Sequence, residues 1–229
     1  MKKKISNKRK TSKAERQKLL HILASILAIS FLLVILRNNL TGGNLNGRRP
    51  GSQNGGAGRA PSIEKPEIKE DFLTKNKYSR PGKILRKVDG IVVHYVANPG
   101  STAQDNRDYF EGLAKTKERK ASSHFLIGLD GEIIQCIPLK EMAYCSNEAN
   151  THTISVECCH PKKDGKFSDK TYASLVDLVS WLCDTYGLTE EDVIRHYDVT
   201  GKICPKYFVD HPDSWDSFRE DIKSRLANQ

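Results

Sequence analysis

The stretch V-D-G-I-V-V-H-Y-V, at Val88–Val96, is rich in β-branched side chains and is broken soon afterwards by Asn98-Pro-Gly. This pattern is typical of a buried strand that runs into a turn. We expect this strand to lie in the core, with the other elements of the fold packed around it. The pattern also places one histidine, His94, near the end of that strand.

Working outward from this strand, helical and extended patterns alternate along the chain. A D-G turn at Asp130-Gly131 joins two apolar runs, which predicts a β-hairpin over 123–137. The other expected elements are helices at 104–115, 172–186 and 213–226 and a strand at 153–159. Because strands and helices interleave, we expect an α/β fold with a mixed central β-sheet flanked by helices.

The N-terminal part has a different character. Residues 1–18 hold nine Lys and Arg but only one acid, and residues 19–36 contain no charge. A helix of that length spans roughly 27 Å, which is enough to cross the core of a bilayer. We therefore expect a basic cytoplasmic tail at 1–18 and a single transmembrane signal anchor at 19–37. The alternative is a cleavable signal peptide, which would leave the rest of the chain secreted.

Gly, Asn, Pro and Ser dominate residues 38–66, and almost nothing there could build a core. This composition predicts a flexible linker, which we place at 38–70, followed by a globular domain at 71–229. Because the excess of Lys and Arg precedes the apolar segment, we expect a single-pass protein of the cell membrane with its domain outside.

The formal net charge of +9 suggests a nucleic-acid partner only until the charges are located. Outside residues 1–18 the chain carries 28 basic and 27 acidic side chains. A nearly neutral domain offers no broad surface for phosphates. We therefore expect no nucleic-acid partner, and we expect a monomer.

The segment R-H-Y-D-V-T-G-K-I-C-P, at Arg195–Pro205, carries the strongest chemical signal. Its many turn-forming residues argue against a regular helix. His196 and Cys204 are residue types that bind zinc, and Lys202 adds a positive charge two residues before the cysteine. A catalytic zinc site would need a third protein ligand and an open position.

Two strand residues are candidates for completing such a site. His94 lies in the strand described first, and Glu157 lies in T-I-S-V-E-C-C. A lone histidine in a strand is more often structural than a ligand. An acid in so apolar a strand is unfavourable unless it is paired or has a task, and alternation places Glu157 on the face opposite to Val156.

From about residue 85 to residue 212 the chain resembles the zinc-dependent N-acetylmuramoyl-L-alanine amidases of the amidase-2 type. This family is related to phage amidase lysozymes and peptidoglycan recognition proteins. The resemblance rests on four ordered pieces: V-V-H-Y at 92–95, S-S-H-F-L-I-G-L-D-G-E-I-I-Q at 122–135, T-I-S-V-E at 153–157, and R-H-Y-D-V-T-G-K-I-C-P at 195–205.

The resemblance implies zinc ligands at His94, His196 and Cys204. It also implies catalytic roles for Glu157 and Lys202. Phage members of the family have a tyrosine directly before the His-Phe pair, whereas this chain has Ser123, which favours proton transfer by Glu157. The histidine of that pair, His124, is a candidate for a fourth zinc ligand, but the resemblance implies that it is a structural or pocket-wall residue.

The implied activity is hydrolysis of the amide between N-acetylmuramic acid and L-Ala of the peptidoglycan stem peptide, with Zn²⁺ as the cofactor. Two neutral imidazoles and one thiolate leave the site with a charge of about +1, so zinc remains a usable Lewis acid. Glu157 would take the proton of the attacking water, and Lys202 would stabilise the oxyanion.

Two other functions are compatible with the same residues. One is a peptidoglycan-binding module of this fold without catalysis, and the other is an anchored protein whose zinc is purely structural. Six cysteines lie within 136–204, and five are left if Cys204 binds metal. One or two disulfides are compatible with a location outside the membrane, but the sequence does not define a pairing.

Overall fold

The computed structural model describes residues 62–228. The expected basic tail, the membrane anchor and most of the linker lie outside the described residues. Among the described helices, none combines the length and the apolar character needed to cross a bilayer.

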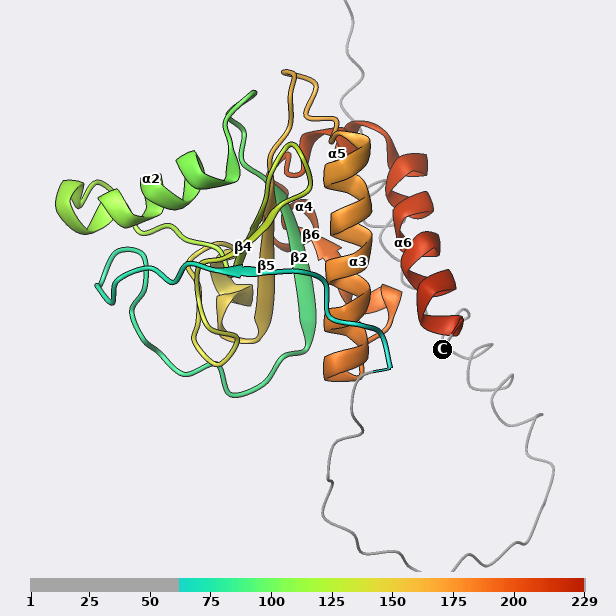
Figure 1. Ribbon diagram of the computed structural model, residues 1–229, viewed down its shortest axis with the longest axis horizontal. Helices are drawn as coiled ribbons and strands as arrows, with labels where there is room; N and C mark the ends of the chain where they lie inside the picture. Colours follow the sequence, from blue (N-terminus) through green and yellow to red (C-terminus); the bar gives the residue numbers. More distant parts are fainter. Residues whose placement is uncertain (1–61, 229) are drawn as a thin grey trace, which may run out of the picture. The chain divides into compact units, whose positions relative to one another are not determined.

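A mixed sheet forms the framework of the described part of the chain (Figure 1). Its strands are β1 (Lys69–Glu70), β2 (Gly90–Tyr95), β3 (Phe125–Ile127), β4 (Ile133–Gln135), β5 (Thr153–Cys158) and β6 (Val193–Arg195). They are arranged in the order β1-β4-β3-β5-β2-β6. The β3–β4 pair is antiparallel and the other pairs are parallel, so the predicted mixed sheet is confirmed.

Helices cover both faces of this sheet. The long ones are α2 (Ala103–Thr116), α3 (Asp169–Tyr186) and α6 (Pro212–Ala227), and each lies where the sequence predicted a helix. Figure 1 shows α3 and α6 side by side on one face of the sheet, with α2 on the other side. Two 3-10 helices, Asn147–Thr151 and Glu190–Asp192, and two short α-helices, α4 (His196–Thr200) and α5 (Lys206–Asp210), complete the described elements.

The helix ends follow from local side-chain chemistry. Thr102 caps the start of α2 by accepting a hydrogen bond from the Asp105 amide, and the Asp105 carboxylate accepts one in return from the Thr102 amide. Helix α3 begins after the capping hydroxyl of Ser168 and ends at Gly187, which has a φ of 67°. We expected no regular helix in 195–205, and this is wrong for one short stretch. Helix α4 makes a little more than one turn before it ends at Gly201.

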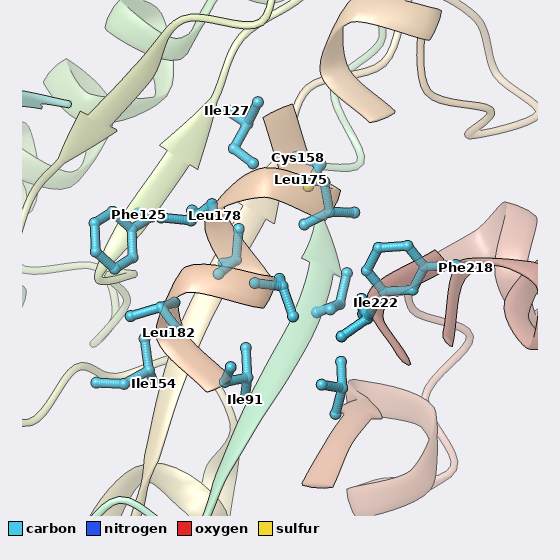
Figure 2. Close-up of a cluster of buried hydrophobic side chains, with 14 of the residues drawn as sticks. Ile91, Phe125, Ile127, Ile154, Cys158, Leu175, Leu178, Leu182, Phe218 and Ile222 are labelled. Carbon is cyan, nitrogen blue, oxygen red and sulfur yellow. The ribbon is translucent and has the colours of Figure 1, made fainter. Parts of the chain in front are cut away.

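The larger core lies between the sheet and the α3–α6 pair (Figure 2). Its labelled members are Ile91, Phe125, Ile127, Ile154 and Cys158 from the strands, Leu175, Leu178 and Leu182 from α3, and Phe218 and Ile222 from α6. Burying each large apolar side chain contributes roughly 1.5–3 kcal/mol. A smaller cluster, which includes Phe110 and Leu113 of α2, covers the opposite face.

The packed part of the chain begins before the boundary at residue 71 that composition suggested. Ile63 and Ile68 pack against the larger core, and β1 joins the edge of the sheet. The Asp184 carboxylate of α3 accepts a hydrogen bond from the Ile63 amide at 2.8 Å. All six cysteines lie in the described part and none forms a disulfide.

Candidate active site and metal centre

Strand alternation and register bring His94 and Glu157 together. Val93 and Val156 point into the larger core, so the residues that follow them point to the opposite face. Strands β2 and β5 are parallel, and their register pairs His94 with Glu157. The two side chains therefore lie next to each other at the carboxyl ends of adjacent strands, where α/β sheets commonly build their sites.

The segment after β6 supplies the other two candidate ligands. Strand β6 pairs in parallel with β2, so His196, the next residue, starts α4 beside the end of β2. The Tyr197 amide donates a hydrogen bond to the Cys204 carbonyl at 2.9 Å, which closes the loop between them. The Arg195 guanidinium holds the same turn by donating to Asp198 at 2.7 Å. This closed loop returns Cys204 to the side of His196.

His94, His196 and Cys204 form a compact cluster of metal-binding side chains. One potential ligand atom from each lies within 4.8 Å of the others, and all three residues are buried. The Cys204 Sγ is 3.7 Å from His94 Nδ1, and the two imidazole rings are 4.7 Å apart between centroids. The structure thus brings together three residues that the sequence separates by as many as 110 positions.

Hydrogen bonds on the outer side of each ring orient the two imidazoles. His94 Nε2 lies 2.9 Å from Ser146 Oγ, and His196 Nε2 lies 3.0 Å from Asn147 Oδ1. His196 Nδ1 is buried without a hydrogen-bond partner among the described residues. Metal-binding histidines characteristically bind such a partner through the nitrogen that does not face the metal. The donor set and the unpartnered nitrogen therefore fit a divalent metal ion of the zinc type.

Burial sets the protonation states of the three residues. It lowers the pKa of His94 well below its ordinary value, helped by His196 and Lys202, and it also lowers the pKa of His196. Both imidazoles are thus held in the neutral form that binds metals. Burial raises the pKa of the Cys204 thiol to about 12, so its thiolate form requires a neighbouring cation.

Glu157 lies beside this cluster in an environment unfavourable to a charge. Its Oε1 accepts a hydrogen bond from the Cys145 thiol at 3.6 Å, while its Oε2 is buried with no partner among the described residues. Burial raises the pKa of Glu157 to about 7, against the lowering effects of Cys145 and Lys202. A carboxyl group with such a pKa can both accept and donate a proton near neutral pH.

Lys202 and Glu157 line one groove with a volume of about 330 Å³. His196 also contributes to its wall, as do Tyr144 and Cys145. Lys202 is exposed, so its ammonium can reach a bound molecule. The groove therefore offers a half-buried acid and an accessible positive charge beside the metal-binding cluster.

Ser123 and His124 have structural surroundings. The Ser123 hydroxyl donates to the Phe125 carbonyl at 2.9 Å, and the residue is fully buried. His124 Nδ1 accepts from the Ser155 amide at 3.0 Å, and its Nε2 donates to the Glu141 carbonyl at 2.9 Å. Because both ring nitrogens are engaged with backbone groups, His124 has none left for a metal.

Three residues of the site were missed by sequence reasoning: Cys145, Ser146 and Asn147. They contact Glu157, His94 and His196 respectively. No pattern in A-Y-C-S-N-E identifies them as neighbours of a metal centre. A weak signal is Asn147 itself, since its φ of 53° is a left-handed conformation that asparagine adopts more readily than most residues.

Comparison with known proteins identifies the family of this chain. The profile of Amidase_2, described as N-acetylmuramoyl-L-alanine amidase, matches residues 85–207, more than half of the chain. The chain belongs to this amidase family. The predicted resemblance is thereby confirmed.

Amidases from two bacilli illustrate the relationship in sequence. N-acetylmuramoyl-L-alanine amidase CwlL of Bacillus licheniformis is 39% identical over 176 residues, which cover 71% of this chain and 48% of that protein. BlyA of Bacillus subtilis strain 168, another N-acetylmuramoyl-L-alanine amidase, is 33% identical over 179 residues, covering 69% and 47% respectively. The chain thus spans about half the length of the curated amidases that it matches.

Solved structures of similar proteins share the fold. PlyL superposes with a TM-score of 0.59 at 27% identity, covering 69% of this chain and 97% of that one. The catalytic domain of XlyA superposes with a TM-score of 0.58 at 29% identity, covering 68% and 99% respectively. The matched part of the chain therefore covers nearly the whole of each of these two structures.

Proposed function

We propose that this protein is a zinc-dependent N-acetylmuramoyl-L-alanine amidase that cleaves the amide between N-acetylmuramic acid and L-Ala of the peptidoglycan stem peptide. The observation that carries the proposal is the cluster of His94, His196 and Cys204 beside the half-buried Glu157. Membership of the amidase family supports the same reaction.

His94, His196 and Cys204 would hold the zinc. Bound there, zinc would lower the pKa of a water molecule and polarise the carbonyl of the amide. Ser146 and Asn147 would keep the two imidazoles in their orientations through the outer nitrogens.

Glu157 would move the proton. As the oxygen of water forms its bond to the carbonyl carbon, the carboxylate accepts the proton of that water. As the carbon–nitrogen bond breaks, the same group returns the proton to the amine of L-Ala. Burial raises the pKa of this carboxyl group, which makes it a better proton acceptor than an exposed carboxylate.

Lys202 would stabilise the negative charge that develops on the carbonyl oxygen. Its side chain is exposed in the groove that contains Glu157, and its charge is close enough to lower the pKa of His94 and His196. Removing a single charge-stabilising group of this kind commonly lowers kcat by a factor of about 10²–10³.

The N-terminal segments would bring the enzyme to its polymer. Residues 1–18 would remain cytoplasmic, 19–37 would anchor the chain in the membrane, and the linker would extend the domain outward. The order of basic, apolar and Gly-rich segments supports this topology. Peptidoglycan lies on that side of the membrane.

Mass spectrometry of purified peptidoglycan digested with the full chain tests the reaction. Free stem peptides that begin with L-Ala are the expected products. The Glu157→Gln variant should be slower by a factor of about 10²–10⁴ while retaining its zinc. The control Glu220→Gln, which removes an exposed carboxylate from α6, should match the wild type.

Other products would reject the proposal. Intact amides with cut sugar linkages would assign a different hydrolase activity. Retention of the chain on peptidoglycan without any released peptide would favour the non-catalytic binding module. Unfolding of Cys204→Ser together with unchanged activity of Glu157→Gln would favour a purely structural zinc.

A further inference from the structure

Residues 115–120, which form the last residues of α2 and the segment that follows it, carry positive charge without local compensation. Lys115, Lys117, Arg119 and Lys120 lie within six residues, and none of them takes part in an ion pair between described residues. The one acid among them, Glu118, instead accepts a hydrogen bond from the Tyr109 hydroxyl at 3.1 Å. The four cations are therefore available to an external anion.

Only two of these cations line the groove of the candidate active site. Arg119 and Lys120 belong to its wall, together with Glu157 and Lys202, whereas Lys115 and Lys117 do not. All four are exposed. The segment thus contains two cations that a molecule in the groove can meet and two that it cannot.

Backbone hydrogen bonds hold the end of this segment in position. The Ala121 amide donates to the Tyr78 carbonyl at 3.1 Å, and the Ser122 amide donates to the Tyr144 carbonyl at 3.0 Å. The Lys120 ammonium lies 5.6 Å from the centroid of the Tyr144 ring, whose side chain also lines the groove. The charge of Lys120 is thereby directed along the groove wall.

The charges of the groove favour an anionic ligand. Its described lining contains three basic side chains, Arg119, Lys120 and Lys202, but only one acid, Glu157. A stem peptide ends in a carboxylate and lies on one side of the scissile amide, while the sugar on the other side is uncharged. The excess positive charge therefore matches the peptide and not the sugar.

We propose that Arg119 and Lys120 form a carboxylate-recognition pair that selects stem peptides with free carboxylates. The proposal rests on the proposed amidase function and adds a specificity to it. Substrates whose carboxylates are amidated would lose these two ionic contacts and bind more weakly.

Steady-state kinetics of the full chain test this pair at low salt. The two substrates are an N-acetylmuramyl peptide with free carboxylates and the same molecule with its carboxylates amidated. We expect the wild type to show a KM for the amidated substrate roughly fivefold to tenfold higher, because two exposed charge contacts are lost. The difference should shrink as salt is added.

The double variant Arg119→Gln/Lys120→Gln should raise KM for the free-carboxylate substrate by about the same factor and abolish the preference between the two substrates. The matched control is Lys115→Gln/Lys117→Gln, which removes the same charge from the same segment but outside the groove. This control should keep the wild-type preference.

Two outcomes would overturn the carboxylate-recognition pair: a wild type that treats both substrates alike, or a control that loses the preference as fully as the double variant. The second would mean general attraction to anionic material. Calorimetric titration of Glu157→Gln with the same two molecules separates the proposals. A carboxylate-dependent affinity without any wild-type turnover would reject the amidase function alone, and turnover without such an affinity would reject the pair alone.

Discussion

Glu157 is the residue of the site whose surroundings are least favourable to its charge. Burial raises its pKa to about 7 from the usual 4.5, so between these values the folded protein binds more protons than the unfolded chain. The stability that this group contributes is fully present below pH 4.5 and is lost as the pH rises through 7. A metal-free protein should therefore become less stable on the alkaline side.

Replacing Glu157 with glutamine should remove this pH dependence. In the metal-free protein at pH 8, Glu157→Gln should be more stable than the wild type by up to about 3 kcal/mol. At pH 5 the gain should be below about 1 kcal/mol. Urea unfolding in the presence of a chelator at the two pH values measures both numbers, and an equal gain at both would contradict the burial of a charge at this position.

Asn147 supports His196 from an unusual backbone conformation. Its φ is 53°, and its Oδ1 lies 3.0 Å from His196 Nε2. The Asn147→Gly variant keeps a residue that tolerates this φ but removes the hydrogen bond, so we expect zinc affinity to fall about 10- to 100-fold with the fold intact. Competition with a zinc chelator measures the change.

A second replacement tests whether the side-chain oxygen of Asn147 is the group that matters. Asn147→Asp retains a side-chain oxygen at the same position and also tolerates a left-handed backbone. It should keep zinc affinity close to that of the wild type. If the glycine variant binds zinc as tightly as the aspartate variant does, the orientation of His196 does not depend on this contact.

At the scale of elements, the β3–β4 hairpin depends on its turn glycine. Gly131 has a φ of 88°, and a Cβ there would lie 2.7 Å from Ser174 Oγ and 3.0 Å from the Lys170 carbonyl of α3. We expect Gly131→Ala to destabilise the protein by about 1–3 kcal/mol, measured by denaturant unfolding.

A second glycine provides a control, because its replacement is expected to increase the stability of the protein. Gly112 lies inside α2, and a Cβ there would meet nothing within 4 Å. Gly112→Ala should therefore stabilise the protein by roughly 0.5–1 kcal/mol through helix propensity. Loss of stability in both variants would mean that the hairpin turn has no special requirement for glycine.

At the scale of the whole molecule, the proposed topology makes a prediction about fractionation. The full chain should remain with membranes after washing with high salt, whereas a chain lacking residues 1–37 should be soluble. A chain lacking only residues 1–18 keeps the apolar segment and should remain in the membrane fraction. A shortened mature N-terminus in cells would instead indicate cleavage of a signal peptide.

Much of the folded part could be predicted because its signals are local. The alternation in T-I-S-V-E-C placed Glu157 opposite to Val156, and the structure confirms those two faces. The D-G turn predicted the hairpin, and Gly187 predicted the end of α3. The packing of Ile63 and Ile68 was not predictable, because two isolated apolar residues in the largely charged stretch S-I-E-K-P-E-I-K-E carry no periodicity.

By itself, the sequence predicted strands β2 to β5, the three long helices and the residue types that can bind a metal, because periodicity and ligand chemistry are written in neighbouring residues. The short strands β1 and β6 were not predicted. Only the tertiary structure decided that His94, His196 and Cys204 meet, and that Ser146, Asn147 and Cys145 contact the site residues. Those contacts depend on strand register and on loop conformation. Both are set by packing between segments that lie far apart along the chain.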